Sequence, residues 1–253
     1  MPRTDWGWKI TAGELEDWTI HRGGGLLVIN KPGLVLCHPS KHGPWSSLVG
    51  ACREYLGAPR LHMPSRLDRE TSGVVVLASD AQLGSRLQRA IEHRQVRKVY
   101  HAILCGELRE SVTVDQPLGR AEGSAVIVRR AVTPGGQPAR TEFEPLGWGG
   151  GFTFARVTPH TGRRHQIRVH ASWLGHAVAG DKIYGPDERL FLEFIESGWT
   201  PRLAAALPFE RQALHASEWI CEEEHARMRF EAPLPGEWSA MTGQSIGKAS
   251  HSQ

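Results

Sequence analysis

The stretch Ser65-Arg66-Leu67-Asp68-Arg69-Glu70-Thr71-Ser72-Gly73 leads directly into the apolar run Val74-Val75-Val76-Leu77-Ala78. The run is continuous and rich in β-branched residues, which predicts a strand buried on both faces. Asp68 therefore stands at the mouth of a core strand, between two arginines that favour its ionised form. Taken alone, this pattern fits a turn whose aspartate makes salt bridges, so a chemical role needs a second observation.

Basic side chains are concentrated in a second segment, Thr158-Pro159-His160-Thr161-Gly162-Arg163-Arg164-His165-Gln166-Ile167-Arg168-Val169-His170. Arginine, histidine, threonine and glutamine side chains together suit contacts with phosphate and sugar. The histidines recur at a spacing that does not place them on one helix face, so we expect no metal site. Taken alone, the segment fits a solvated basic surface equally well.

Glycine and proline residues indicate where the secondary-structure elements around the first segment begin and end. The pattern predicts two short strands on either side of Gly23-Gly24-Gly25, a turn at Asn30-Lys31-Pro32-Gly33 and a resumed strand at Leu34-Val35-Leu36. A helix is expected near 45–56, stopped by Gly57 and Pro59.

The remaining elements alternate without a regular strand–helix–strand rhythm. Asp80 is placed to cap a helix whose apolar residues recur every four positions at Leu83, Leu87 and Ile91. Strands are expected over 99–104 and 152–157, a hairpin region that contains 141–146, and a helix over 165–174. The irregular order favours the α+β class.

Composition sets broad limits. The chain has 253 residues, 40% of them hydrophobic and 23% charged, which is typical of a soluble globular protein with a full core. The net charge of +3 permits a nucleic-acid partner without requiring one. The four cysteines form no C-x-x-C pair, so reduced thiols in a cytoplasm are expected. The N-terminus has no signal-peptide pattern, and no apolar run is long enough to span a membrane.

The two segments together resemble motifs of the RluA-type RNA pseudouridine synthase family. Residues 66–73 resemble its catalytic loop, Lys98-Val99-Tyr100 its Lys-x-Tyr strand, and 161–170 its third motif. Residues 26–33, Gly180-Asp181-Lys182-Ile183-Tyr184-Gly185 and Leu214-His215-Ala216 resemble further motifs in the family's order. The resemblance implies the pseudouridine-synthase fold, a mixed, mainly antiparallel central sheet flanked by helices and loops.

The resemblance also implies a reaction. Specific uridines in ribosomal or transfer RNA are flipped out, detached from ribose, rotated and rejoined through C5, with no cofactor. Asp68 is expected to be the catalytic carboxylate, which either attacks C1′ or removes the C2′ proton. Arg168 is expected to pair with Asp68, and Tyr100 to stack on the base or transfer a proton. An ordinary core tyrosine is the alternative for Tyr100.

Several residues are expected to bind RNA by the same resemblance. Arg66 is expected to fill the place of the flipped base, and Leu214 to form the apolar floor of the base pocket, although a core leucine fits as well. Phosphate contacts are expected from Arg163, Arg164, His165, Lys182 and Lys98. The helix bearing Arg86, Arg89 and Arg94 is a weaker candidate.

Two departures from the family pattern affect the expected organisation. Ser65 stands where the family usually has histidine, and we expect the small N-terminal RNA-binding domain of many relatives to be missing. We expect an N-terminal extension over 1–16, a catalytic domain over 17–240 and a disordered tail over 241–253. The expected protein is a cytoplasmic monomer without a membrane partner.

Two other functions compete with this interpretation. A non-catalytic RNA-binding protein could keep the fold, but it would have no chemical reason to hold Asp68, Tyr100 and Arg168 together. A carboxylate-dependent glycosidase would need a second acid across the scissile bond. Glu70 is the nearest candidate, on the same turn. Release of tritium from C5-labelled uridine separates the three, because only the isomerisation displaces that hydrogen.

Overall fold

The computed structural model describes residues 8–38, 42–223, 226–238 and 247–248. The chain divides into two compact units, one made of residues 3–98 with 216–233 and the other of 99–215 with 234–253. The chain passes from one unit to the other within strands β4 (Val96–Cys105) and β10 (Leu214–Glu223).

The first unit is built on an antiparallel hairpin and a buried strand. Strand β1 (Thr19–Gly23) pairs with β2 (Leu26–Lys31), and β2 pairs with β3 (Ser72–Ala78) in a register that places Val28 opposite Val76. Strand β10 follows β3, and β11 (Ala226–Glu231) pairs with β10. Every residue of β3 is buried, as the continuous apolar run predicts.

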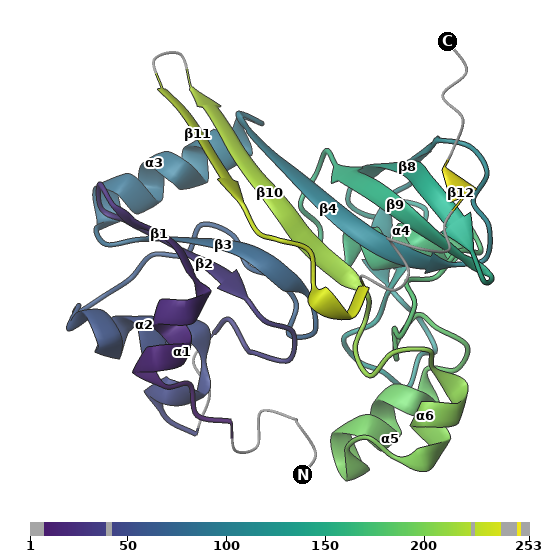
Figure 1. Cartoon of the computed structure of the whole chain (residues 1–253). Helices are drawn as coiled ribbons and strands as arrows, with labels where there is room; N and C mark the ends of the chain where they lie inside the picture. The colour runs from purple at the N-terminus through teal and green to yellow at the C-terminus, as the bar shows by residue number, and fades with distance from the viewer. Residues whose placement is uncertain (1–7, 39–41, 224–225, 239–246, 249–253) are drawn as a thin grey trace. The chain divides into compact units, whose positions relative to one another are not determined.

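Helices cover both faces of this sheet (Figure 1). Helices α1 (Ala12–Trp18) and α2 (Leu48–Leu56), the latter preceded by the short helix η1 (Pro44–Ser46), pack on one face, where Leu27 and Val75 point. Helix α3 (Ala81–Glu92), capped by Asp80, packs on the other face. The alternation of β2 and β3 side chains between two helical layers explains why both strands read as continuous apolar runs.

The N-terminal part of the first unit belongs to its core. Ile10 and Leu15 are 3% and 1% exposed and pack with α2 and the sheet, so residues 8–16, predicted as an extension, are ordered. The predicted strand over 34–36 is wrong. Leu34 adopts a left-handed turn with φ 72°, and the Leu36 carbonyl accepts a hydrogen bond from the N–H of Leu48. The backbone after Pro32 is thus used to hold the start of α2.

The second unit contains an antiparallel sheet and a small separate hairpin. The strand order is β4, β9 (Phe152–Pro159), β8 (Arg140–Gly149) and β12 (Gly247–Lys248), and β5 (Val112–Asp115) also pairs with β8. The hairpin joins β6 (Leu118–Arg120) to β7 (Arg130–Val132). Of the predicted tail 241–253, only Gly247 and Lys248 lie within the described residues, and they form β12.

Three helices complete the second unit. Helix α4 (Gln166–Trp173) contacts β7, β8 and β9, and coincides with the helix expected over 165–174. Helices α5 (Arg189–Ser197) and α6 (Pro201–Ala206) follow it and were not expected. Every strand pair described in register is antiparallel, so the predicted α+β class with a mainly antiparallel sheet is confirmed. No helix in the described ranges has the length and apolar character needed to cross a membrane.

Candidate active site

A buried lysine binds the backbone of the loop that carries Asp68. Lys31, at the end of β2, is fully buried, and its ammonium donates to the carbonyls of Pro32, Val35 and Arg69 at 2.9, 3.0 and 3.0 Å. The N–H of Thr71 donates to the Asp68 carbonyl at 3.2 Å, which closes a turn around the carboxylate. The backbone carbonyls of Asp68 and Arg69 are therefore held by hydrogen bonds, and the Asp68 residue itself is half-buried.

Gly73 allows this loop to enter β3. Its φ of 111° lies in the region that favours glycine, and a Cβ there would stand 2.1 Å from the Ala216 carbonyl oxygen. The loop can thus lie directly against the backbone of β10. Any larger residue at position 73 would move Asp68 or the neighbouring strand.

Arg66 lies on the exposed side of the same loop. Its Nη1 donates to Nε2 of His38 at 2.8 Å. Burial, and then the charge of Arg66, lower the pKa of His38, so its ring is neutral at pH 7 and accepts this hydrogen bond. Arg66 is therefore oriented but accessible.

In the second unit, Gln166 fixes the loop before α4. Its side chain is 4% exposed, and its amide oxygen accepts from the Thr161 hydroxyl at 2.7 Å and the Arg163 N–H at 3.0 Å. Its amide nitrogen donates to the Arg140 carbonyl and the Thr141 hydroxyl, both at 2.9 Å. The basic loop is thereby tied to β8, and the side chains of the next turn are placed by α4.

Arg168 is held by a buried carboxylate on the next loop. Its Nε and Nη2 donate to Asp181 Oδ2 and Oδ1 at 2.6 and 2.8 Å, and the two side chains are 7% and 0% exposed. Asp181 Oδ1 also accepts from the N–H groups of Ile183 and Tyr184 at 2.9 and 3.1 Å. Burial alone would raise the pKa of Asp181, but the Arg168 charge and these hydrogen bonds outweigh it and hold the pKa below its ordinary value.

Tyr184 connects Arg168 to the basic loop. The Arg168 guanidinium lies 5.0 Å from the centre of the Tyr184 ring. The Tyr184 hydroxyl accepts from the Arg130 N–H at 2.8 Å and shares a hydrogen bond with Nδ1 of His165 at 2.9 Å. His165 has a left-handed φ of 57° directly before α4. The orientation of Arg168 therefore depends on the loop that contains Asp181 and Tyr184.

The other predicted site residues of the second unit differ in exposure. Tyr100 is 9% exposed on β4 opposite Val157, and Leu214 is 4% exposed, positions that suit either a pocket wall or the core. Arg163 and Arg164 are exposed, and Arg163 Nε donates to the Pro138 carbonyl at 3.0 Å. Both arginines are accessible to a phosphate.

The two predicted lysine contacts are not equivalent. Lys182 is 1% exposed, and its ammonium donates to the Glu210 carbonyl at 2.6 Å and lies 4.3 Å from the centre of the Phe194 ring. This burial contradicts the predicted phosphate contact, because the ammonium is inside the protein and donates to a backbone carbonyl there. Lys98, in the first unit, is half-buried, and burial lowers its pKa to about 8.

The predicted catalytic residues are divided between the units, Asp68 in the first and Tyr100 and Arg168 in the second. The pairing of Asp68 with Arg168 stays a prediction. Asp181 and Tyr184 stood in a motif of the sequence, but their roles as supports of Arg168 were missed, since only the fold brings them to it. The first unit thus carries a half-buried carboxylate, and the second a fixed arginine beside a loop whose basic side chains suit contacts with nucleic-acid phosphates.

Comparison with known proteins identifies the family of the chain. A family model described as RNA pseudouridylate synthase matches residues 25–173. The ribosomal large subunit pseudouridine synthase D of Vibrio vulnificus is 35% identical over 223 residues, 86% of this chain and 64% of that protein. The protein of that name from Nitrosomonas europaea is 34% identical over 96% of this chain and 72% of its own length. The chain belongs to the RNA pseudouridylate synthase family.

A solved structure agrees with this assignment. Human RNA Pseudouridylate Synthase Domain Containing 1 matches with a TM-score of 0.73 and 26% identity, covering 92% of this chain and 90% of that chain. The curated relatives are longer, since this chain spans 64% of the Vibrio vulnificus protein.

Proposed function

We propose that this protein converts specific uridines of RNA to pseudouridine, with Asp68 as the catalytic carboxylate. The observation that carries the proposal is the family match over 25–173, which includes the loop of Asp68 and all of α4. The names of the bacterial relatives favour RNA of the large ribosomal subunit as the substrate, and transfer RNA is the second candidate. Residues 17–240 would form the catalytic domain of a cytoplasmic monomer.

The chemistry assigns a role to each predicted residue. Asp68, as a carboxylate, attacks C1′ of the flipped nucleotide or removes its C2′ proton, and Lys31 holds the backbone of its loop at the Arg69 carbonyl. Arg168 would complement this carboxylate. A guanidinium has five N–H donors, and the pair with Asp181 uses two of them, Nε and Nη2. Isomerisation involves neither redox change nor net hydrolysis, so no cofactor is required.

The base needs a site of its own during the rotation. Tyr100 would stack on the uracil or move a proton at the sugar, and Leu214 would form the apolar floor. Arg66, exposed and oriented by His38, would occupy the space that the flipped base leaves. Arg163, Arg164 and His165 would hold phosphates of the same strand.

The test is release of tritium from RNA transcripts labelled at C5 of uridine, followed by digestion and identification of pseudouridine. Unmodified transcripts of large-subunit ribosomal RNA and of transfer RNA are compared. The proposal expects release with equal formation of pseudouridine from one of the two. RNA binding without release would favour the non-catalytic alternative, and free uracil in the products would favour a glycosidase.

A further inference from the structure

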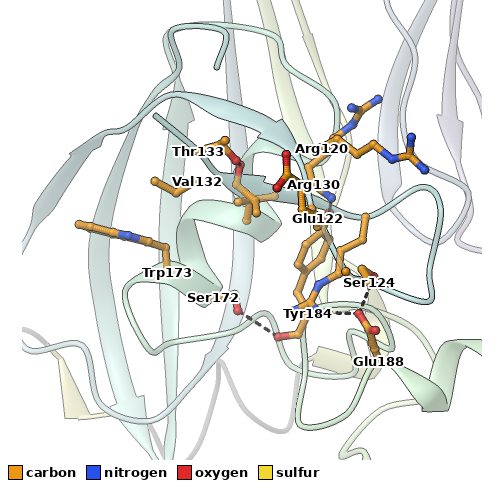
Figure 2. Close-up of a pocket in the computed structure, with 15 residues that line it drawn as sticks. Arg120, Glu122, Ser124, Arg130, Val132, Thr133, Ser172, Trp173, Tyr184 and Glu188 are labelled. Atoms are coloured by element: carbon orange, nitrogen blue, oxygen red, sulfur yellow. Dashed lines mark hydrogen bonds and ion pairs between the residues drawn. The ribbon is translucent and has the colours of Figure 1, made fainter. Parts of the chain in front are cut away.

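The second unit contains an open cavity of about 590 Å³, shown in Figure 2. Its walls come from the β6–β7 hairpin, from α4 and from the loop of Tyr184 and Glu188. The volume falls within the range of about 300–1,000 Å³ usual for sites that hold small molecules or nucleotides. None of the residues predicted to act in catalysis or RNA binding lines it.

Two arginines face each other on one wall. Arg120 on β6 and Arg130 on β7 are direct cross-strand partners in the antiparallel hairpin. Like charges directly opposite each other destabilise a strand pair. Among the described residues, neither guanidinium has an ion pair or hydrogen-bond partner, and Glu122, which also lines the cavity, forms no ion pair with them. This juxtaposition is suited to an anion shared by both guanidinium groups.

The third arginine that lines the cavity, Arg129, differs from these two because it has a carboxylate partner. Arg129 Nη1 forms an ion pair with Glu188 Oε2, at 2.5 Å. Glu188 also accepts from the Ser124 hydroxyl and the Ala125 N–H at 2.7 and 3.0 Å. Arg129 is therefore a structural residue that anchors the hairpin loop, whereas Arg120 and Arg130 are available to a ligand.

An aromatic side chain lines another part of the cavity, and in Figure 2 the side chains of Arg120 and Arg130 extend away from it. Trp173, the last residue of α4, is 52% exposed and lines the cavity together with Val132 and Val169. Exposed aromatic rings in RNA-binding proteins stack on unpaired bases, whatever the base. An anion site and a separate stacking surface together suit a single-stranded stretch of RNA, which contacts such proteins through both its phosphates and its bases.

We propose that this cavity and its rim bind a single-stranded stretch of the substrate RNA, with a backbone phosphate between Arg120 and Arg130 and an unstacked base on Trp173. The inference rests on the proposed function for the nature of the ligand. Val169 and Trp173 belong to the helix that carries Arg168, and Tyr184 forms a wall of the cavity and contacts Arg168. The bound stretch thus flanks the target uridine and does not include it.

The test compares two variants with a matched control in the full chain. Arg120→Gln with Arg130→Gln removes the facing charges, and Trp173→Ala removes the ring. Arg189→Gln with Arg202→Gln makes the same change in net charge on α5 and α6. Single-turnover tritium release gives the saturating rate and the half-saturating RNA concentration, and filter binding of the same ribosomal RNA transcript gives affinity.

The arginine variant should raise the half-saturating concentration about tenfold or more and keep the saturating rate. Its affinity should depend less on salt, with a slope lower by about 0.7 for a single-stranded phosphate. Its melting temperature should not fall, because a like-charge pair is removed. Trp173→Ala should weaken binding about fivefold or more, and Trp173→Phe should restore most of it.

Each result has a defined meaning. If both variants bind and turn over RNA like the control, the cavity is not an RNA site and the inference is overturned. If the parent binds RNA but releases no tritium, the proposed function fails, while the binding titrations still decide the cavity. Loss of the saturating rate at unchanged affinity would also overturn the inference, because it would place these residues in the chemistry.

Discussion

The buried pair between Arg168 and Asp181 gives the sharpest stability prediction. Asp181→Asn keeps the shape of the side chain and an oxygen for the N–H groups of Ile183 and Tyr184. It removes the negative charge opposite a guanidinium that is 7% exposed. The two hydrogen bonds of 2.6 and 2.8 Å would become, at best, one hydrogen bond from the charged guanidinium to a neutral amide oxygen.

The expected loss of stability follows from the burial of the ion pair. Removing one partner of a buried ion pair leaves an uncompensated charge and costs about 3–5 kcal/mol. Asparagine retains some hydrogen bonding, so we expect the lower end, about 3 kcal/mol. Glu144→Gln is the matched control, because Glu144 and Arg156 also pair, at 2.9 Å, but are 33% and 44% exposed. Such an exposed pair contributes about 1 kcal/mol at most.

Urea unfolding with hydrogen exchange of the α4 amides measures both variants in the same unit. Asp181→Asn should also lower the saturating rate of tritium release, because Arg168 loses the group that orients it. A loss of stability no larger than that of Glu144→Gln would refute the reasoning. It would show that Arg168 finds equivalent partners when Asp181 is neutral.

Four further predictions concern individual residues and reagents. Lys98 has a pKa of about 8 in the folded chain and about 10.4 when unfolded, so the unfolded chain binds more protons between these values. Parent stability relative to Lys98→Met should therefore rise from pH 8 to 10, and a constant difference would contradict this burial. Gly73→Ala should lower the free energy of unfolding by about 3 kcal/mol or more, because it adds a clash with Ala216 to an unfavourable φ. The control Gly57→Ala, with φ 60° and open space, should lower it by about 1–2 kcal/mol. Equal losses of stability in thermal unfolding would exclude the close approach of Gly73 to Ala216. Arg164→Ala should weaken RNA binding and lower its salt slope by about one unit, with the saturating rate kept. Excess EDTA should leave tritium release unchanged, and a loss restored by one metal would show an unrecognised site.

Local patterns predicted much of the first unit. The apolar runs of β2 and β3, the glycine turn between β1 and β2, and the Asp80 cap of α3 each depend on residues close in sequence. The prediction failed after Pro32, where apolar Leu34 and Val35 are buried in an irregular loop. An apolar residue in the sequence indicates that its side chain is buried, but it does not indicate the backbone conformation. In this loop, hydrogen bonds with α2 determine the backbone conformation.

Buried charges were the other limit of sequence reasoning. Lys31 and Lys182 look like surface lysines in the sequence, yet both are in the interior because the fold brings carbonyl oxygens to their ammonium groups. The support of Arg168 by Asp181 is of the same kind, since its partners lie on a helix and a separate loop. Motif order identified which residues matter, and three-dimensional contacts were needed to say what each one does.

Single-turnover tritium release with Asp68→Asn and Arg168→Lys tests the central claim most directly. Asp68→Asn should release no tritium while RNA affinity stays within about severalfold, because affinity comes mainly from phosphate contacts. Arg168→Lys keeps the charge but lacks the planar fork, so its saturating rate should fall sharply. Release by Asp68→Asn at nearly the parent rate would contradict the claim that this carboxylate performs the isomerisation.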